Sequence, residues 1–367
     1  MVTVRVPLPA ERDEAYDIVI DRGLLTELPH LLRDASPAAR YAVITDSHLQ
    51  SRYGERVVAA LEGAGLPAQL FAFPAGEWNK TRDTWSGLCD RMLAGRFGRD
   101  SAVVALGGGV VGDVAGFVAA TYLRGIPWVQ VPTSLLAMID SSIGGKTGVD
   151  VPAGKNLVGA FHQPRLVVAD LDVLATLPPN QFAAGMAEAV KHGVIADAAY
   201  FALLEREADR IGAREPAMVE SVVRRSVEIK AEVVAADVRE AGRRAVLNFG
   251  HTVAHAIETT SRYEVLHGEA VAIGMRMEAT LAERLGVAAP GTADRITALL
   301  ERHALPLDRP RGESGSTDEL MAAMTQDKKG RGAIRFALPA RIGQMHRTER
   351  GDWTIDASEE AIRAVIA

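Results

Sequence analysis

Three histidines stand close together in the segment LNFGHTVAHAIETTSRYEVLHGEAVAIGM (247–275), although the whole chain has only nine. His251 and His255 are four residues apart, a spacing that brings two imidazoles to one face of a helix and to one metal ion. No glutamate follows the first histidine as in a metalloprotease helix, so that hydrolytic class is excluded. His267 comes later, near the start of the next expected helix. A single histidine of this kind is more often packed in a core than bound to a metal, and spacing alone does not decide which two bind.

A carboxylate that could complete such a site lies in GMAEAVKHG (185–193). Glu188 and Lys191 are three residues apart, on one face of a helix. Such a pair is often a surface ion pair, but the neighbouring residues are small and apolar, so both charges are expected to be partly buried, which is costly without a purpose. Three histidines together with Glu188 predict a zinc site of imidazole and carboxylate ligands. Cys89 is the only cysteine, which excludes a thiolate cluster and an intrachain disulfide.

A glycine turn in SAVVALGGGVVGD (101–113) has the G-x-G-x-x-G spacing, through Gly107, Gly109 and Gly112, directly after an expected strand. Glycines there let backbone N–H groups approach a pyrophosphate at a helix N-terminus. The usual dinucleotide fingerprint also has an acidic residue at the end of the next strand, and VQVPTS has none. Asp46, at the end of an earlier strand, could bind the ribose instead. The alternative is a tight turn that only packs a strand on a helix.

Basic residues follow glycines in two further segments, MIDSSIGGKTGVD (138–150) and GKNLVGAF (154–161). Lys146 and Lys155, together with Arg124, suggest an anionic substrate with phosphate or carboxylate groups. The alternative is a set of solvated surface lysines. The apolar flanking residues and the expected glycine-rich loops argue against that alternative. A second group of charged residues precedes the histidines: Lys230, Glu240, Arg243 and Arg244.

The elements that must position these residues fall into two halves. Short β-rich runs alternate with helical patterns in the first half, which predicts a parallel, Rossmann-like α/β sheet with strands at 41–46, 68–74, 101–106 and 128–132. From about Pro178 nearly every segment carries apolar residues at helical spacing, with a late strand pair or loop at 333–344. We therefore predict an α/β domain over 1–177 and a mostly α-helical domain over 178–367. Ligands of such proteins usually bind in the cleft between domains.

Composition limits the classes of partner. A hydrophobic content of 48% and a charged content of 24% are those of an ordinary globular protein. The net charge of −6 argues against general affinity for nucleic acid or anionic membranes. The N-terminal residues lack a signal peptide's apolar core, and no uncharged run reaches the length of a membrane span. The sequence predicts a cytoplasmic protein.

Long motifs in this chain resemble the 3-dehydroquinate synthase family. They are GGGVVGDVAGFVAATYLRGI, VPTSLLAMIDSSIGGKTGVD, GKNLVGAFHQP, GMAEAVKHG, LNFGHTVAHAIE and HGEAVAIGM. The resemblance runs from about Asp46 to the segment DKKGRGAIRFALP (327–339). It implies an NAD-binding α/β domain, a helical metal-binding domain and a homodimer. The implied reaction converts 3-deoxy-arabino-heptulosonate 7-phosphate to 3-dehydroquinate and phosphate.

The resemblance also implies which residues act. The implied metal ligands are Glu188, His251 and His267, with zinc as the metal and cobalt as a common substitute. His255 is then a proton-transfer group rather than a ligand, which differs from the simplest argument on spacing. The implied catalytic pocket contains Asp140, Lys146, Lys155, Lys191, Lys230, Arg244, Asn248 and His255.

The remaining implied roles concern the cofactor and the substrate. NAD is expected to contact Asp46, Glu77, Lys80, Gly108, Gly109, Asp113, Thr133, Ser134 and Thr176. The substrate is expected to contact Arg124, Asn156, Glu240 and one of the two lysines Lys328 and Lys329.

Three other functions remain as alternatives. A sister sugar-phosphate cyclase, such as an aminodehydroquinate or deoxy-inosose synthase, would use the same chemistry on a related substrate. A metal-dependent NAD alcohol or glycerol dehydrogenase would share the layout and release NADH, but would not need the lysine-rich pocket. A non-catalytic NAD-binding module would have little reason to keep both a ligand set and the lysines.

Overall fold

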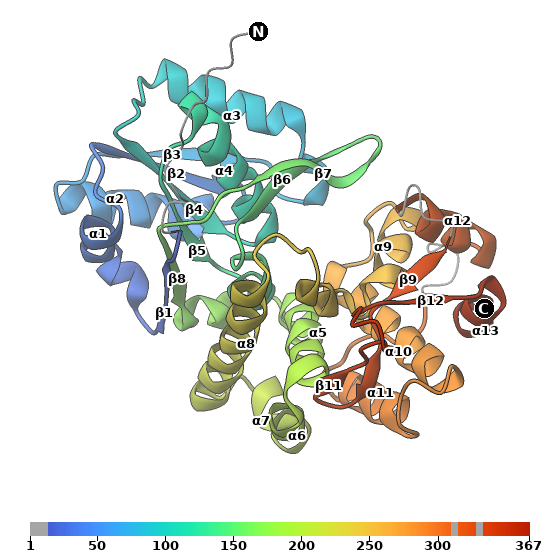
Figure 1. Cartoon of the computed structure of the whole chain (residues 1–367). Helices are drawn as coiled ribbons and strands as arrows, with labels where there is room; N and C mark the ends of the chain where they lie inside the picture. The colour runs from blue at the N-terminus through green and yellow to red at the C-terminus, as the bar shows by residue number, and fades with distance from the viewer. Residues whose placement is uncertain (1–13, 310–314, 328–332) are drawn as a thin grey trace, which may run out of the picture.

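Six parallel strands form the sheet of the first half, in the order β1-β8-β5-β4-β2-β3. They are β1 (Asp17–Asp21), β2 (Arg40–Asp46), β3 (Ala68–Phe73), β4 (Ser101–Gly107), β5 (Trp128–Pro132) and β8 (Leu166–Asp170). The structure is a computed structural model, and it describes residues 14–309, 315–327 and 333–367 (Figure 1). Lys328 and Lys329 therefore lie outside the described residues. The predicted parallel α/β sheet and its four expected strands are confirmed.

Helices cover both faces of this sheet. They are α1 (Leu24–Ala35), α2 (Glu55–Gly63), α3 (Arg82–Ala94) and α4 (Gly109–Thr121). Alternate residues of a strand point to opposite faces. Val43 and Val104 accordingly pack in the core that includes α1 and α2, whereas Ile44 and Val103 pack in the core that includes α3 and α4. Strands buried on both faces explain the continuous apolar runs in the sequence.

An antiparallel hairpin replaces the two glycine-rich loops that the sequence suggested. Its strands are β6 (Lys146–Val151) and β7 (Gly154–Phe161). The expectation of loops was wrong here because the glycines serve close packing. A Cβ on Gly159 would lie 2.0 Å from the carbonyl oxygen of Thr147, and one on Gly116 of α4 would lie 2.4 Å from the Thr147 side chain. The hairpin thus lies against α4 and carries Lys146 and Lys155.

The second half is mostly helical, as predicted. Its helices are α5 (Pro179–Ala196), α6 (Ala198–Arg206), α7 (Ala208–Gly212), α8 (Pro216–Ala236), α9 (His251–Thr260), α10 (His267–Arg284), α11 (Thr292–Arg302), α12 (Thr317–Asp327) and α13 (Glu359–Ile366). Figure 1 shows this half beside the sheet, with α5 and α8 nearest to it. The predicted boundary near residue 177 lies just before α5 and stays a prediction.

Short strands complete the chain. β9 (Ile334–Phe336) pairs with β12 (Ile355–Ala357), and β10 (Pro339–Arg341) pairs with β11 (Gln344–Met345). The late strand pair expected at 333–344 is therefore present, although β9 finds its partner twenty residues further on. Across the described ranges, none of the helices is both long enough and apolar enough to span a bilayer.

Candidate active site

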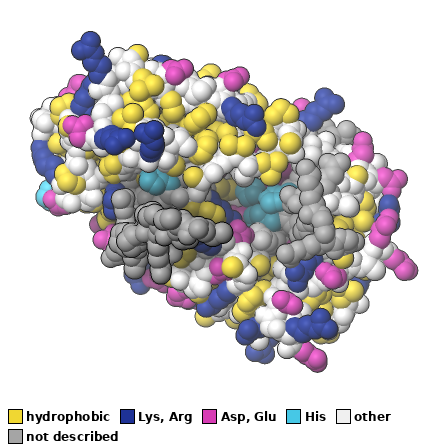
Figure 2. Space-filling model, turned by 45° about the horizontal axis from the view of Figure 1, so that its top comes forward, with side chains coloured by type: hydrophobic (Ala, Val, Ile, Leu, Met, Phe, Trp, Pro, Cys, Tyr) yellow, Lys and Arg dark blue, Asp and Glu magenta, His cyan; other side chains and the backbone are white. Residues whose placement is uncertain are grey.

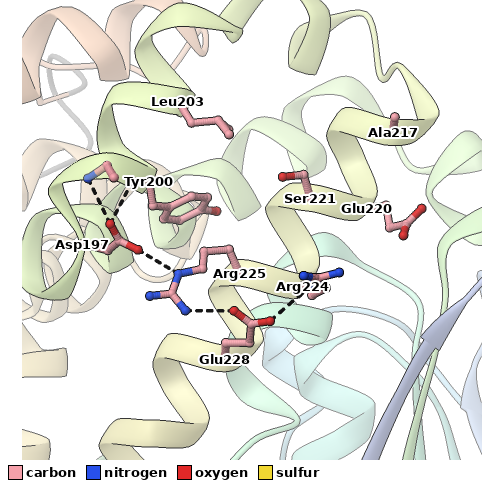
Figure 3. A pocket seen from close by; sticks show the side chains of 10 residues that line it. Asp197, Tyr200, Leu203, Ala217, Glu220, Ser221, Arg224, Arg225 and Glu228 are labelled. Atoms are coloured by element: carbon pink, nitrogen blue, oxygen red, sulfur yellow. Dashed lines mark hydrogen bonds and ion pairs between the residues drawn. The ribbon is translucent and has the colours of Figure 1, made fainter.

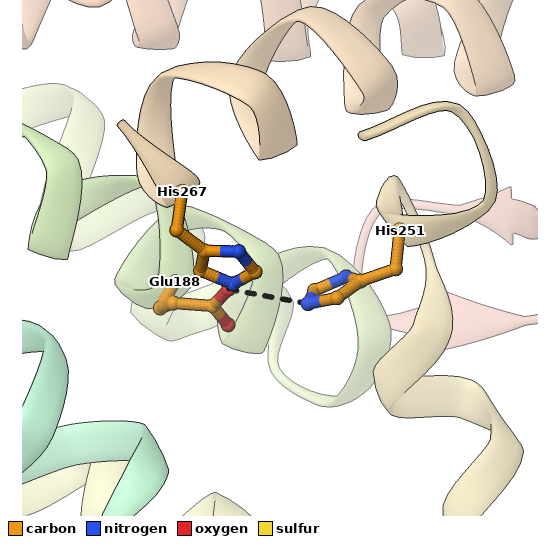
Figure 4. Close-up of side chains that lie close together, drawn as sticks. All are labelled: Glu188, His251 and His267. Atoms are coloured by element: carbon orange, nitrogen blue, oxygen red, sulfur yellow. Dashed lines mark ion pairs between the residues drawn. The ribbon is translucent and has the colours of Figure 1, made fainter. Parts of the chain in front are cut away.

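Glu188, His251 and His267 converge from three helices (Figure 4). The Nε2 atoms of His251 and His267 each lie 3.6 Å from Oε1 of Glu188. One ligand atom from each residue lies within 4.8 Å of the others. Oε1 of Glu188 is buried, and within the described ranges it has no hydrogen-bond partner. A buried carboxylate oxygen left in this way fits a metal ligand. Two imidazole nitrogens and a carboxylate are donors that zinc accepts, and three protein ligands leave a coordination position open.

Two glycines allow these helices to approach. Gly250 precedes His251 with φ at +82°, a left-handed conformation that favours glycine, and a Cβ there would lie 2.6 Å from Met275 of α10. Gly268 follows His267, and a Cβ there would lie 2.0 Å from the carbonyl oxygen of Ala184 in α5. The glycines of FGH and HGE therefore bring each histidine against its neighbouring helix.

Three further charged residues lie close to Glu188. Lys191 forms an ion pair with Glu188, and both side chains are almost fully buried. Lys230 of α8 donates to the Asp140 carboxylate at 2.5 Å and to the Asp140 backbone oxygen at 2.6 Å. Asp140 lies in a short π-helical turn, Ala137–Ser141, and its carboxylate is 3.9 Å from Lys191. Both lysines therefore point at the region of Glu188, where anionic oxygens of a ligand would find ammonium groups.

Burial and ion pairing shift the pKa values of these groups in opposite directions. Burial alone would raise the pKa of Glu188, but the Lys191 ammonium and the two histidines hold that pKa well below its usual value. Burial alone would lower the pKa of the Lys191 ammonium, but the carboxylates of Glu188 and Asp140 raise that pKa. For Lys230, burial dominates over Asp140 and lowers the pKa. Of the two lysines, Lys230 is therefore the one whose environment favours giving up a proton.

The two candidate histidine ligands have different environments. Burial and then the Lys191 charge lower the pKa of His251 to about 3, so its imidazole is neutral, as a metal ligand must be. For His267, burial is outweighed by Glu258 and Glu188, and the pKa rises to about 10. A metal ion there would have to displace a proton from His267. His255 presents its ring edge-to-face to His251, with 5.5 Å between ring centroids, and is not among the three converging donors.

A second group with metal-like spacing contains Asp140, Glu188 and His192. His192 is fully buried, and burial followed by the charge of Lys191 lowers its pKa to about 3. Lys230 and Lys191 already contact the two carboxylates. A cation placed among two ammonium groups would be repelled. We therefore interpret His192 as a neutral core histidine.

The expected cofactor residues lie where the parallel strands end. Asp46 ends β2, Gly108 follows β4, and Thr133 follows β5 and donates its N–H to the Gly107 oxygen at 3.0 Å. Ligands of open α/β sheets bind at this carboxyl edge. Thr176 lies beyond β8, in the 3₁₀ segment Leu171–Thr176, and its hydroxyl is 2.7 Å from that of Tyr53.

A polar chain connects this edge with the hairpin. Lys80, which is 3% exposed, donates to Asp113 of α4 at 2.5 Å and to the side-chain oxygen of Asn156. Glu77 forms an ion pair with Lys155 at 2.8 Å. These residues of the GEWNK segment, α4 and β7 were each expected at the site, and the structure brings them together.

The remaining expected residues divide into two groups. Lys146 forms an ion pair with Glu240, which also accepts a hydrogen bond of 3.3 Å from Asn248. Arg244 is buried in the 3₁₀ segment Arg243–Asn248, and a Cβ on Gly144 would lie 2.3 Å from its guanidinium. Arg124, by contrast, is exposed, and within the described ranges no hydrogen bond or ion pair joins it to the cluster. Its role in substrate binding stays a prediction.

Sequence reasoning missed two buried carboxylates. Glu258 of α9 contacts both His267 and Lys155. Glu278 of α10 accepts from the backbone N–H groups of Gly250 at 2.7 Å and Val253 at 3.1 Å, and so caps the start of α9. The signal for Glu258 was present, because positions 251, 255 and 258 lie on one face of a helix. The capping role of Glu278 depends on tertiary packing and has no local signal.

The space-filling view shows a hollow on one face, where histidine side chains gather with acidic and basic ones (Figure 2). A different pocket, of about 480 Å³, lies between α6 and α8 (Figure 3). Several of its charged side chains pair with each other, since Arg225 pairs with Asp197 and Glu228 at 2.8 Å. This pocket lacks the converging donors of the Glu188 cluster.

Comparison with known proteins decides the family. The sequence model of the 3-dehydroquinate synthase N-terminal domain matches residues 70–184, and that of the C-terminal domain matches residues 185–330. The chain belongs to the 3-dehydroquinate synthase family. A 3-dehydroquinate synthase of Symbiobacterium thermophilum is 50% identical over 354 residues, which cover 96% of this chain and 97% of that protein. The family resemblance of the motifs is thus confirmed.

Solved structures of related cyclases share the fold of the family. A 2-epi-5-epi-valiolone synthase from Streptomyces hygroscopicus subsp. jinggangensis, with NAD⁺ and Zn²⁺ bound, is 31% identical; the match covers 99% of this chain and 98% of that one, with a TM-score of 0.87. A 2-deoxy-scyllo-inosose synthase in complex with carbaglucose-6-phosphate, NAD⁺ and Co²⁺ is 26% identical, with a TM-score of 0.84 and 95% of each chain covered.

Proposed function

We propose that this protein is a 3-dehydroquinate synthase, a carbon–oxygen lyase that converts 3-deoxy-arabino-heptulosonate 7-phosphate to 3-dehydroquinate and phosphate. The observation that carries the proposal is the convergence of Glu188, His251 and His267 beside buried lysines. The 50% identity to a 3-dehydroquinate synthase over nearly the whole chain supports this substrate over that of a sister cyclase.

The cofactors would be NAD and a divalent metal, zinc or cobalt, as in the solved cyclases. Glu188, His251 and His267 would hold the metal, because their donors converge and Oε1 of Glu188 has room for a further partner. The start of α4 fits the pyrophosphate of NAD, since within the described ranges no side chain caps it. The metal would supply polarisation of a substrate hydroxyl, and NAD would supply reversible hydride transfer.

The chain's own residues would bind the anionic substrate and move protons. Lys146, Lys155 and Arg244 supply positive charge for phosphate and carboxylate groups. Oxidation of a ring alcohol would acidify the neighbouring carbon–hydrogen bond. When that proton is removed, the electrons of the carbon–hydrogen bond form a carbon–carbon double bond, and phosphate leaves with the electrons of its own carbon–oxygen bond. The substrate phosphate itself can accept that proton. His255 lies beside the metal ligand His251, where it can transfer the hydroxyl proton.

NAD would end unchanged, and ring opening followed by an intramolecular aldol step would then close the carbocycle. We also propose the assembly and location that the family implies, a homodimer in the cytoplasm, in the shikimate pathway of aromatic amino acid biosynthesis.

The decisive experiment measures phosphate release from 3-deoxy-arabino-heptulosonate 7-phosphate with catalytic NAD and zinc, while absorbance reports NADH. Stoichiometric phosphate and dehydroquinate without net NADH would support the synthase. Net NADH without phosphate would indicate a dehydrogenase. Activity only on the substrates of aminodehydroquinate or deoxy-inosose synthases would indicate a sister cyclase.

Three variants test the roles of the histidines. His251→Ala and His267→Ala should abolish metal binding, because each removes one of three ligands, and turnover should fall by about a thousandfold. His255→Ala should retain the metal and slow turnover by about a hundredfold, the usual contribution of a proton-transfer group. Metal analysis and phosphate release check both. Loss of metal from His255→Ala with retention in His267→Ala would reverse the ligand assignment.

A further inference from the structure

Glu258 occupies a position that connects the candidate metal site with the cofactor side. Its side chain lies on α9, seven residues after His251, and is 2% exposed. The same oxygen, Oε1, is 3.0 Å from Nδ1 of His267 and 3.0 Å from Nζ of Lys155. One buried carboxylate therefore contacts a candidate metal ligand and a candidate substrate lysine.

The contact with His267 fixes which ring nitrogen is available. A proton on Nδ1 is donated to Glu258, and Nε2 lies 3.6 Å from Glu188. The proton that a metal ion would displace is therefore the one on Nε2, whose lone pair would then face the metal. Histidine ligands of metals generally need such a partner, which sets both the tautomer and the ring orientation. Glu188 and His251 contribute no atom to this contact, so Glu258 is the carboxylate that orients His267.

The contact with Lys155 connects Glu258 to the hairpin, because Lys155 lies on β7. Lys155 is held between Glu258 and Glu77, at 3.0 Å and 2.8 Å. Its ammonium also lies 5.6 Å from the centroid of the Tyr263 ring. A long lysine side chain with two carboxylate partners loses much of its rotamer freedom. Glu258 thereby places Lys155 at a fixed distance from His267.

We propose that Glu258 is a positioning residue, which orients His267 toward the metal and holds Lys155 beside it. The proposal rests on the proposed function for the identity of the metal site. It adds a residue that neither the motifs nor the ligand geometry assigned, and it predicts a defect in metal binding that is separable from turnover.

The test measures the affinity of the full-length, metal-free protein for Zn²⁺ by competition with a chromophoric chelator. Glu258→Gln keeps the shape of the side chain and removes its charge. We expect its dissociation constant for Zn²⁺ to rise by about 10- to 100-fold, the usual effect of removing the partner of a ligating histidine. With Co²⁺ in place of Zn²⁺, the visible ligand-field spectrum should change, because His267 is no longer held in one orientation.

Glu264→Gln is the matched control. Glu264 is an exposed glutamate in the same connection between α9 and α10, and its loss removes the same charge. Its Zn²⁺ affinity and Co²⁺ spectrum should equal those of the wild type. Equal weakening in Glu264→Gln and Glu258→Gln would overturn the proposal, because the effect would then come from net charge.

Further outcomes separate this proposal from the proposed function. Failure of the wild type to bind Zn²⁺, or full binding by His267→Ala, would contradict the metal site itself. Wild-type affinity in a folded Glu258→Gln protein would overturn only the role of Glu258. If circular dichroism showed that Glu258→Gln does not fold, Glu258→Asp would replace it. That variant keeps the charge but shortens the reach, and retention of wild-type affinity by it would equally overturn the proposal.

Discussion

The glycine turn after β4 and the charged cluster around Glu188 are built in opposite ways for the polar groups that we propose they bind. The turn offers backbone from one contiguous segment, and within the described ranges a Cβ on Gly108 would come within 4 Å of Ser134 alone, at 3.5 Å. The cluster offers side chains from separate helices, with Glu188 and Lys191 almost fully buried. The turn leaves open space in which a ligand could approach the backbone, whereas the cluster presents charged side chains that already pair with each other. Filling the open space at Gly108 should therefore weaken ligand binding, whereas removing one partner of a buried charge pair in the cluster should lower the stability of the fold.

Lys191→Met tests the cluster, where we expect the largest effect. Removing the ammonium leaves Glu188 and Asp140 buried with less compensating charge. Breaking a buried pair in this way typically costs about 3–5 kcal/mol of unfolding free energy. Urea unfolding of the protein in a chelator should show this loss. The loss should shrink when Zn²⁺ is added, since a metal ion would replace the ammonium as the partner of Glu188.

Lys146→Met is the control for this prediction. Lys146 also pairs with a glutamate, Glu240, but its side chain is 51% exposed. Solvent screens such a pair, which contributes about 0–1 kcal/mol. Similar losses from Lys146→Met and Lys191→Met would show that burial does not distinguish the cluster, and the comparison would fail.

Two alanine substitutions test the turn, with an intermediate expected effect. A Cβ on Gly107 would lie 2.5 Å from Val111, so Gly107→Ala should lower stability by about 1–3 kcal/mol through overpacking. Gly108→Ala meets only an ordinary contact and should fold like the wild type. Its methyl group would instead occupy space beside the uncapped start of α4, and NAD affinity should fall by about tenfold, or 1.4 kcal/mol.

Urea unfolding and calorimetric titration with NAD separate these two effects. A Gly108→Ala protein that binds NAD with wild-type affinity would leave the turn as a packing feature of strand and helix. This is the alternative interpretation of the G-x-G-x-x-G spacing given above. The substitution at Gly107 alone would not distinguish a packing turn from an NAD-binding turn.

The contrast between the two regions also explains what the sequence could predict about the fold. Strands β2, β3, β4 and β5 are continuous apolar runs followed by helical patterns, so local pattern identified them. β1 was not predicted, because its sequence DIVID is short and partly exposed at the sheet edge. β8 was not predicted either, although it is fully buried, because it follows the hairpin rather than a helix. The hairpin glycines suggested loops because their packing partners lie on another element.

The site divides in the same way. The turn and the charged motifs were visible as types and spacings, and Glu188, His251 and His267 were named through the family resemblance. Spacing alone favoured His251 and His255 as the two metal ligands, because residue spacing reports only on positions within one helix. The approach of His267 depends on the contact between Gly268 and Ala184, which are far apart in sequence. Glu258 was on the predicted helix face, but only the fold shows that it contacts His267.

His303 sharpens the comparison, because it is a buried group without the pairing that the cluster provides. It lies at the end of α11 and is 6% exposed. Among the described residues, no carboxylate forms an ion pair with it, and burial, followed by the charge of Arg302, lowers its pKa to about 4. The unfolded chain has a histidine pKa of about 6.5, so below pH 6.5 the unfolded state binds more protons than the folded state.

The stability that His303 contributes is therefore complete above pH 6.5 and is lost as the pH falls toward 4. His303→Gln cannot titrate in this range and serves as the reference. The free energy of unfolding of the wild type, relative to this variant, should fall by about 2 kcal/mol between pH 7 and pH 4.5. Parallel urea titrations across this range check the prediction. A constant difference would show that His303 finds a compensating partner, and burial without pairing would then no longer distinguish it from His267, whose pKa is raised to about 10 by its carboxylate partners.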